Sequence, residues 1–200
     1  MKLLAINGSP NKRNTLALLE AIANEAKKLG AEVEILNLSE FSINPCKGCD
    51  ACLKGDCVQK DDIYKVLEAM QKADAIVIGA PTYFGNVPGI LKNLIDRSRM
   101  ARMGGFKLKN RVFAPVITSG LRHGGAEFAA MSLIVYALGQ GMIVVSNTEN
   151  PITTGSFPIG VIQGDSGWRG VKKDEIALNT ARALAKRVVE VANATKALRA

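Results

Sequence analysis

The chain has 200 residues, of which 48% are hydrophobic and 22% charged, and its formal net charge is +8 at pH 7. This length suffices for a sizeable core, so we expect residues 1–200 to form a single domain. No apolar run approaches the roughly 18 residues of a membrane span, and the opening MKLLAINGSP lacks the long apolar region of a signal peptide. We therefore expect a cytoplasmic protein with reduced thiols and no membrane partner.

The positive charge does not by itself indicate a nucleic-acid-binding protein. Lysines and arginines are scattered along the chain, and aromatic residues are only 5% of the total, too few to stack bases. Two explanations stay open. The charge is either a solvated basic surface, or it attracts anionic partners such as a nucleotide cofactor or an acidic carrier protein.

Short apolar segments alternate with segments of helical spacing along the chain. The sequence predicts strands at 2–7, 32–38, 75–79, 111–118 (with Pro115 as an interruption) and 142–146. Helices are expected at 15–29, 61–72, 88–99, 126–138 and 173–197, and residues 147–172 as a long irregular segment. This alternation predicts an α/β fold with a five-stranded parallel sheet and helices on both faces. Functional groups should lie on loops after the carboxyl ends of strands.

The loop after the first strand, residues 8–15, is rich in hydrogen-bond donors and leads directly into a helix. It is neither the G-x-G-x-x-G fingerprint nor a P-loop. Ser9, Asn14 and Thr15 could bind a phosphate monoester together with the helix N-terminus, and Arg13 would supply the counter-charge. The alternative is that Asn14 or Thr15 only caps the helix.

Two later loops suit a flat aromatic cofactor. In residues 80–88, Tyr83 or Phe84 could flank a ring, Gly85 allows close backbone approach, and Asn86 can both donate and accept hydrogen bonds. Alternatively, the two aromatic side chains pack beneath the loop. Residues 118–125 are small and donor-rich and would close the far side of the ring. We assign no proton transfer to His123, the single histidine, because a lone loop histidine is more often exposed and polar.

Four cysteines lie within twelve residues, and the chain has no others. Cys46, Cys49, Cys52 and Cys57 follow the pattern C-x2-C-x2-C-x4-C after the second predicted strand. The close triad is typical of iron–sulfur ligation, although the last gap differs from the bacterial ferredoxin run and valine follows it. Structural zinc usually pairs two knuckles across a longer separation. A [4Fe–4S] cluster, a zinc ion and a set of free or redox-switching thiols all remain possible.

Three motifs resemble the NAD(P)H-dependent FMN reductase group of flavodoxin-like proteins: residues 8–10, residues 81–86 and residues 91–97. The cysteine run is similar to that of the iron–sulfur flavoprotein branch of this group. The resemblance implies a flavodoxin-like fold, FMN near a subunit interface, a [4Fe–4S] cluster on the four cysteines, and dimers or dimers of dimers. It assigns Ser9, Asn14 and Thr15 to the FMN phosphate, Pro81, Thr82, Tyr83, Phe84, Gly85 and Asn86 to the isoalloxazine ring, and Ser119 and Gly120 to its vicinity.

The resulting hypothesis is a redox flavoprotein that passes electrons between an external donor, ferredoxin or NAD(P)H, and an acceptor. Lys47 and Lys54 flank the cysteines and could stabilise a reduced cluster. One alternative is a cluster-free NAD(P)H-dependent FMN or quinone reductase. Another is a non-enzymatic flavodoxin-like carrier, against which the positive charge counts, and a nucleic-acid-binding zinc module is more distant. We assign no catalytic side chain. Within residues 147–172, Phe157 and Trp168 are candidate interface anchors or local packing residues.

Overall fold

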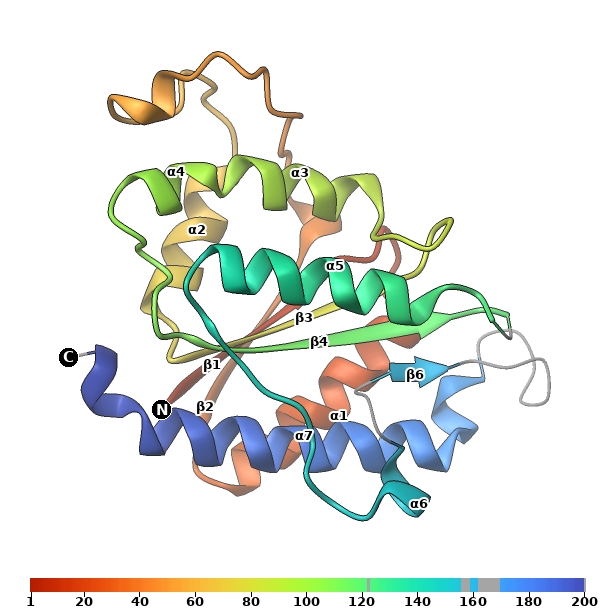
Figure 1. Ribbon diagram of the computed structural model, residues 1–200. Helices are drawn as coiled ribbons and strands as arrows, with labels where there is room; N and C mark the ends of the chain where they lie inside the picture. Colours follow the sequence, from red (N-terminus) through yellow and green to blue (C-terminus); the bar gives the residue numbers. More distant parts are fainter. Residues whose placement is uncertain (122, 156–158, 162–169, 200) are drawn as a thin grey trace.

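The computed structural model describes residues 1–121, 123–155, 159–161 and 170–199. A parallel sheet lies at the centre, with helices on both faces (Figure 1). Its strand order is β2-β1-β3-β4-β5, and β6 also pairs with β4. The strands are β1 (Lys2–Asn7), β2 (Glu32–Asn37), β3 (Ala75–Pro81), β4 (Val112–Ser119), β5 (Ile143–Val144) and β6 (Ile159–Val161). The predicted five-stranded parallel sheet and its flavodoxin-like order are confirmed.

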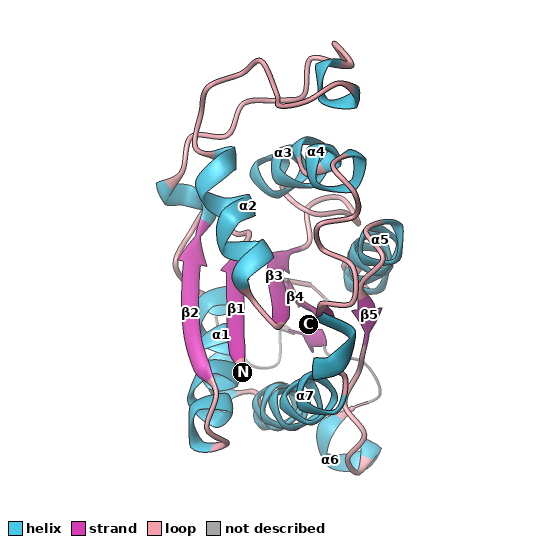
Figure 2. Ribbon diagram, turned by 90° about the vertical axis from the view of Figure 1, so that its left-hand side faces the viewer, coloured by secondary structure: helices cyan, strands magenta, loops and turns pink. Residues whose placement is uncertain are grey.

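Two layers of helices cover the sheet, as Figure 2 shows. One face carries α1 (Asn14–Lys28) and α7 (Glu175–Ala194), and the other carries α2 (Ile63–Lys72), α3 (Gly89–Arg97) and α5 (Ala126–Gly139). The short helices are α4 (Arg99–Met103), which follows α3, and α6 (Pro151–Thr154). None of the helices in the described ranges combines the length and the apolar character that crossing a membrane requires.

The central strands are apolar on both sides because both faces of the sheet are covered. Leu4 and Ile78 are buried in the core beneath α2, α3 and α5, whereas Leu3 and Val77 are buried beneath α1 and α7. Such continuous apolar runs are typical of parallel strands between two helical layers. The alternation of side chains along each strand therefore produces two separate cores from one sheet.

Pro115 explains a difference between the predicted and the observed fifth strand. β5 pairs only with the start of β4, and β6 pairs with its end. The carbonyls of Arg111 and Phe113 accept hydrogen bonds from the β5 segment. Alternate residues of a strand direct their backbone groups to the same edge, so Pro115 also faces the edge of β4 along which β5 runs. Proline has no N–H to donate, and the neighbouring strand is interrupted beside it. The strand expected at 142–146 is therefore only two residues long, and β6 was not predicted.

Two other predictions are corrected. The helix expected over 88–99 breaks at Ser98, whose hydroxyl donates to the carbonyl of Ile95 at 2.7 Å while its own oxygens accept from the amide of Gln140. The segment 147–172 is not wholly irregular, since it contains α6, β6 and the start of a short 3-10 turn at Val171–Lys173. Phe157 and Trp168 lie outside the described residues.

Arg199 fastens the C-terminal end to the sheet, and we expect Arg199→Ala to lower the free energy of unfolding by about 2 kcal/mol. The side chain is 3% exposed, pairs with Asp74 at 3.2 Å and donates to Thr195 Oγ1 at 2.8 Å. Urea unfolding followed by circular dichroism measures the change. The exposed Arg187–Glu190 pair provides the control, because Arg187→Ala should cost about 0.5 kcal/mol or less. Equal losses in the two variants would contradict the anchoring role.

Candidate functional site

A pocket of about 170 Å³ opens at the carboxyl edge of the sheet, where β1 and β3 lie side by side. Strands β2 and β3 leave β1 on opposite sides, so this is the point where the strand order reverses. Three loops, which follow β1, β3 and β4, line the pocket. The lining residues are Ser9, Asn11, Arg13, Asn14, Thr15, Pro81, Thr82, Tyr83, Thr118, Ser119 and Gly120. Nine of the twelve residues predicted to bind FMN thus meet in one pocket; Phe84, Gly85 and Asn86 do not line it.

Buried hydroxyl groups form the floor of this pocket. Thr15 Oγ1 and Thr118 Oγ1 are 2.9 Å apart, and this bond joins the start of α1 to the end of β4. Ser9 is held from two sides, because its N–H donates to Asn7 Oδ1 at 3.2 Å and its Oγ accepts from the N–H of Asn11 at 3.1 Å. Asn7 was missed from the sequence, although a polar residue at the end of a buried strand is a usable signal.

The N-terminus of α1 faces the pocket with its amides available. Asn14 and Thr15 both line the pocket, and they occupy the first turn of the helix. In the described part of the chain, no side chain caps this helix and no acidic residue lies in its first turn. Helix capping by Asn14 or Thr15, the alternative considered above, is therefore not observed. Free amides and the positive end of a helix dipole suit a phosphate group.

The aromatic loop after β3 is a tight turn that projects from the pocket rim. Tyr83 and Asn86 exchange backbone hydrogen bonds at 2.7 and 3.0 Å, with φ values of 50° at Phe84 and 73° at Gly85. Positive φ at both central residues is the signature of a type I′ turn. Phe84 is fully exposed at its tip, and the side chain of Asn86 accepts from the N–H of Val87. The turn therefore presents an aromatic side chain to solvent rather than packing it beneath the loop.

Glycines bring the second and third loops into contact. A Cβ on Gly125, whose φ is 80°, would lie 2.7 Å from the Cα of Gly85, so this approach requires glycine. Thr82 Oγ1 adds a hydrogen bond to the carbonyl of Gly124 at 3.2 Å. His123 is exposed and does not line the pocket. The two loops that the sequence assigned to opposite sides of a ring thus form one continuous wall.

The four cysteines line a second, smaller pocket above α3 and α4. Its lining residues are Cys46, Lys47, Cys49, Asp50, Cys52, Cys57, Gln59, Asp96, Arg97, Arg99 and Met100. All four thiols are unbridged, with Cys46 and Cys49 exposed and the other two half-buried. Across the described residues, no three cysteine, histidine or acidic side chains are arranged around a single ion position. The donor set of four thiols in one pocket does fit a [4Fe–4S] cluster in number and chemistry.

A buried ion pair closes the base of the cysteine segment, residues 44–61. The side chains of Arg97 and Asp61 are 1% and 5% exposed, and they form two bonds of 2.8 and 3.2 Å. Arg97 also donates to the carbonyl of Asn44 at 3.0 Å, and Asp61 accepts from the N–H of Asn44 at 3.0 Å. Burial alone raises the pKa of Asp61, but the Arg97 guanidinium and the amide donors lower it to about 2. Arg97 on α3 therefore holds both ends of the segment, Asn44 and Asp61, by hydrogen bonds.

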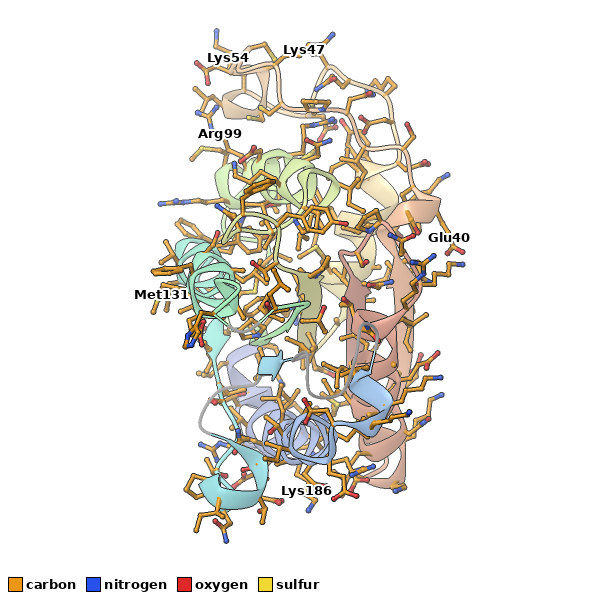
Figure 3. All side chains as sticks on the ribbon, turned by 90° about the vertical axis from the view of Figure 1, so that its right-hand side faces the viewer. Glu40, Lys47, Lys54, Arg99, Met131 and Lys186 are labelled. Carbon is orange, nitrogen blue, oxygen red and sulfur yellow. The ribbon has the colours of Figure 1, made fainter. Side chains whose placement is uncertain are left out.

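Beyond the Arg97–Asp61 ion pair, which we call the clamp, the cysteine segment projects away from the helices (Figure 1). Arg99 reaches it from α4 and pairs with Asp50 at 2.6 Å. Figure 3 shows Lys47 and Lys54 at the outer end of the segment and Arg99 beneath it. The sequence drew attention to the two lysines and missed Arg97, Arg99 and Asp61. Asp61 lies 36 residues from Arg97, and the only sequence signal for the pair was the similarity of residues 91–97 to the reductase motif.

Comparison with known proteins places this architecture in a family. Residues 1–155 match the family model described as NADPH-dependent FMN reductase. The chain is 79% identical to an iron-sulfur flavoprotein of Archaeoglobus fulgidus over 199 residues, which covers 100% of this chain and 99% of the relative. An iron-sulfur flavoprotein of Methanocaldococcus jannaschii is 38% identical over 98% of this chain and 100% of its own length.

A solved structure supports the fold assignment. The NAD(P)H:quinone oxidoreductase from Methanothermobacter marburgensis superposes with a TM-score of 0.68 at 16% identity, over 94% of this chain and 96% of its own. The donor-rich loops at the carboxyl edge of the sheet agree with the family model, and the relatives match the chain from end to end. The chain belongs to the NADPH-dependent FMN reductase family, in its iron–sulfur flavoprotein branch, and is an FMN-dependent oxidoreductase.

Proposed function

We propose that this protein is a cytoplasmic redox flavoprotein, a single domain that carries both FMN and a [4Fe–4S] cluster. The observation that carries the proposal is the pocket lined by all four cysteines, on a chain whose family binds FMN. Electrons would pass between an external donor, of the ferredoxin or NAD(P)H type, and an acceptor. Family membership favours an enzyme over the alternative of a non-enzymatic carrier.

The first pocket supplies the contacts that FMN needs. Ser9, Asn14, Thr15 and the amides of α1 would bind the phosphate, with Arg13 as counter-charge. Residues 81–83 and Ser119 and Gly120 would contact the ring, and the exposed turn at 84–86 would contact its outer part. When bound, FMN supplies a centre that exchanges one or two electrons, and the residues of this chain bind and orient it.

The second pocket supplies thiolate ligands for a centre that exchanges one electron at a time. Cys46, Cys49, Cys52 and Cys57 would be its ligands, and the similarity to two archaeal iron-sulfur flavoproteins supports this assignment. The charge of the cluster would be balanced in part by Lys47, Lys54 and the arginines of α3 and α4. Together, the two centres would convert two-electron into one-electron transfer.

The test is an assay of iron, acid-labile sulfide and FMN in protein purified without oxygen. We expect about four iron, four sulfide and one FMN per chain. In Cys52→Ala, iron and sulfide should be lost while FMN is retained, because the two pockets share no residue. Full FMN content without iron or sulfide in the anaerobic wild type would leave the alternative, a cluster-free NAD(P)H-dependent FMN or quinone reductase.

An exposed apolar face on α5 favours a homodimer or a homotetramer. Phe128, Met131, Val135 and Leu138 recur at helical spacing, and all are exposed, Val135 by 62% and Phe128 by 75%. Met131 points outward from this helix in Figure 3. A continuous apolar stripe in contact with water marks an interaction surface, and a second copy of this chain is the occupant we propose.

We expect Val135→Lys to convert the oligomer into monomers, because a lysine in the middle of the stripe would be buried without a counter-charge. Size-exclusion chromatography with light scattering measures the mass. Ile152→Lys is the matched control, since Ile152 is 83% exposed on α6, away from the stripe. A Val135→Lys protein with the same mass as the wild type would contradict the assignment of this face.

A further inference from the structure

Arg97 is the buried cation of the cysteine pocket. It is the last residue of α3 and lines the pocket together with all four cysteines. Its side chain is 1% exposed. The other basic residues there differ in this respect, because Arg99 is 40% exposed and Lys47 is exposed at the outer end of the segment. A charge shielded from solvent acts more strongly on its neighbours than an exposed charge does.

One N–H donor of the Arg97 guanidinium, the Nε–H, has no hydrogen-bond acceptor among the described residues. The two terminal nitrogens are bonded to Asp61, and one of them also to the carbonyl of Asn44. The Nε–H is buried, and among the described residues it has no hydrogen-bond partner. A buried donor on a charged group is costly to leave unpaired, so an acceptor is expected at this position.

Cys57 is the cysteine best placed for this donor, because it is half-buried in the same pocket and lies four residues before Asp61, the ion-pair partner of Arg97. Burial lowers the pKa of Arg97, whereas the hydrogen bonds and charge of Asp61, with Cys57 as a smaller cause, raise it above its ordinary value. The backbone of Cys57 is itself fixed, because Tyr64 Oη on α2 donates to its carbonyl at 2.8 Å. Cys57 is therefore held to α2, in the pocket that Arg97 lines from α3.

We propose that Arg97 is the positioning residue of the cluster site, which donates its Nε–H to Cys57 Sγ and favours the reduced form of the cluster. The inference rests on the proposed function, because it requires a cluster on these cysteines. Uptake of one electron makes a four-thiolate cluster more negative by one charge. A hydrogen bond to a ligating sulfur and a buried positive charge both stabilise that form, so they raise the reduction potential.

The experiment compares Arg97→Gln with Arg99→Gln, which removes the same charge from an exposed position two residues away. A redox titration with dithionite and mediators, followed by electron paramagnetic resonance, measures the midpoint potential of the cluster. In Arg97→Gln, we expect the equilibrium to move against reduction by about tenfold or more, which is about 59 mV for one electron. Arg99→Gln should move it by less than about twofold, because solvent and salt screen that charge.

Further variants separate positioning from loss of folding. Arg97→Lys keeps the positive charge beside Asp61 but has no N–H at the position of Arg97 Nε, so the potential of its cluster should lie between those of the wild type and Arg97→Gln. If Arg97→Gln does not fold, Asp61→Asn combined with Arg97→Gln replaces the ion pair by two neutral amides, and its potential should still fall. If the anaerobically purified wild type contains no iron and sulfide, the proposed function itself is wrong. If the wild type contains the cluster but every Arg97 variant that folds has the same midpoint potential, the role of Arg97 is wrong and the proposed function stands.

Discussion

Replacing Asp61 by alanine is expected to lower the free energy of unfolding by about 3–5 kcal/mol, the largest stability loss we predict for this chain. The reason is that Asp61→Ala leaves the Arg97 guanidinium, 1% exposed, without its counter-charge and releases one end of the cysteine segment. Denaturant unfolding of the protein without its cofactors measures the change and keeps metal binding out of the comparison.

The neighbouring carboxylate provides the control for this prediction. Asp62 also pairs with a lysine, at 2.7 Å, and accepts from the N–H of Ser42 at 2.9 Å, but its side chain is 27% exposed. Asp62→Ala should therefore cost about 1 kcal/mol. If the two variants lose the same stability, the ion pair is not the clamp that we describe.

The same carboxylate makes stability depend on pH in the acid range. The pKa of Asp61 is lowered from 3.8 to about 2 in the folded chain, so the folded state holds this proton less tightly than the unfolded state. Its contribution is fully present above about pH 4 and is lost as the pH falls towards 2. This shift corresponds to about 2–3 kcal/mol, at about 1.4 kcal/mol per pKa unit. The loss should be absent from Asp61→Asn, whose amide does not titrate.

Placing a carboxylate at Ser9 is expected to weaken FMN binding by at least about a hundredfold. Ser9 is buried at the floor of the pocket, next to the uncapped start of α1. In Ser9→Asp, the new charge would occupy the anion site and repel the phosphate, and losing charge-assisted hydrogen bonds of this kind costs about 3 kcal/mol. Fluorescence titration of the apoprotein with FMN measures the dissociation constant.

Two comparisons make the result at Ser9 specific. Ser39→Asp introduces the same charge at an exposed serine outside the pocket and should leave FMN affinity within about twofold of the wild type, because the charge is screened. Riboflavin lacks the phosphate, so Ser9→Asp should weaken its binding far less than that of FMN. An equal loss for both ligands would mean that the substitution disturbs the ring site rather than the phosphate site.

The sequence alone determined the features that depend on local pattern. Apolar runs such as residues 2–7 and 75–79 predicted buried parallel strands, because a strand covered on both faces must be apolar on both. Loop composition, together with the resemblance to the reductase group, identified nine residues that the structure brings together in one pocket. The spacing of the cysteines predicted a common site, since ligands three residues apart in a short loop cannot lie far from one another.

Only the tertiary structure decided the features that join distant parts of the chain. Pro115 interrupts not its own strand but the neighbouring one, which required knowledge of which side of β4 it faces. Ser98, where the predicted helix breaks, accepts a hydrogen bond from Gln140, 42 residues later, and the ion pair at the base of the cysteine segment joins Asp61 to Arg97 across 36 residues. Sheet register and helix packing place these groups within bonding distance, and neither can be read from local residue patterns.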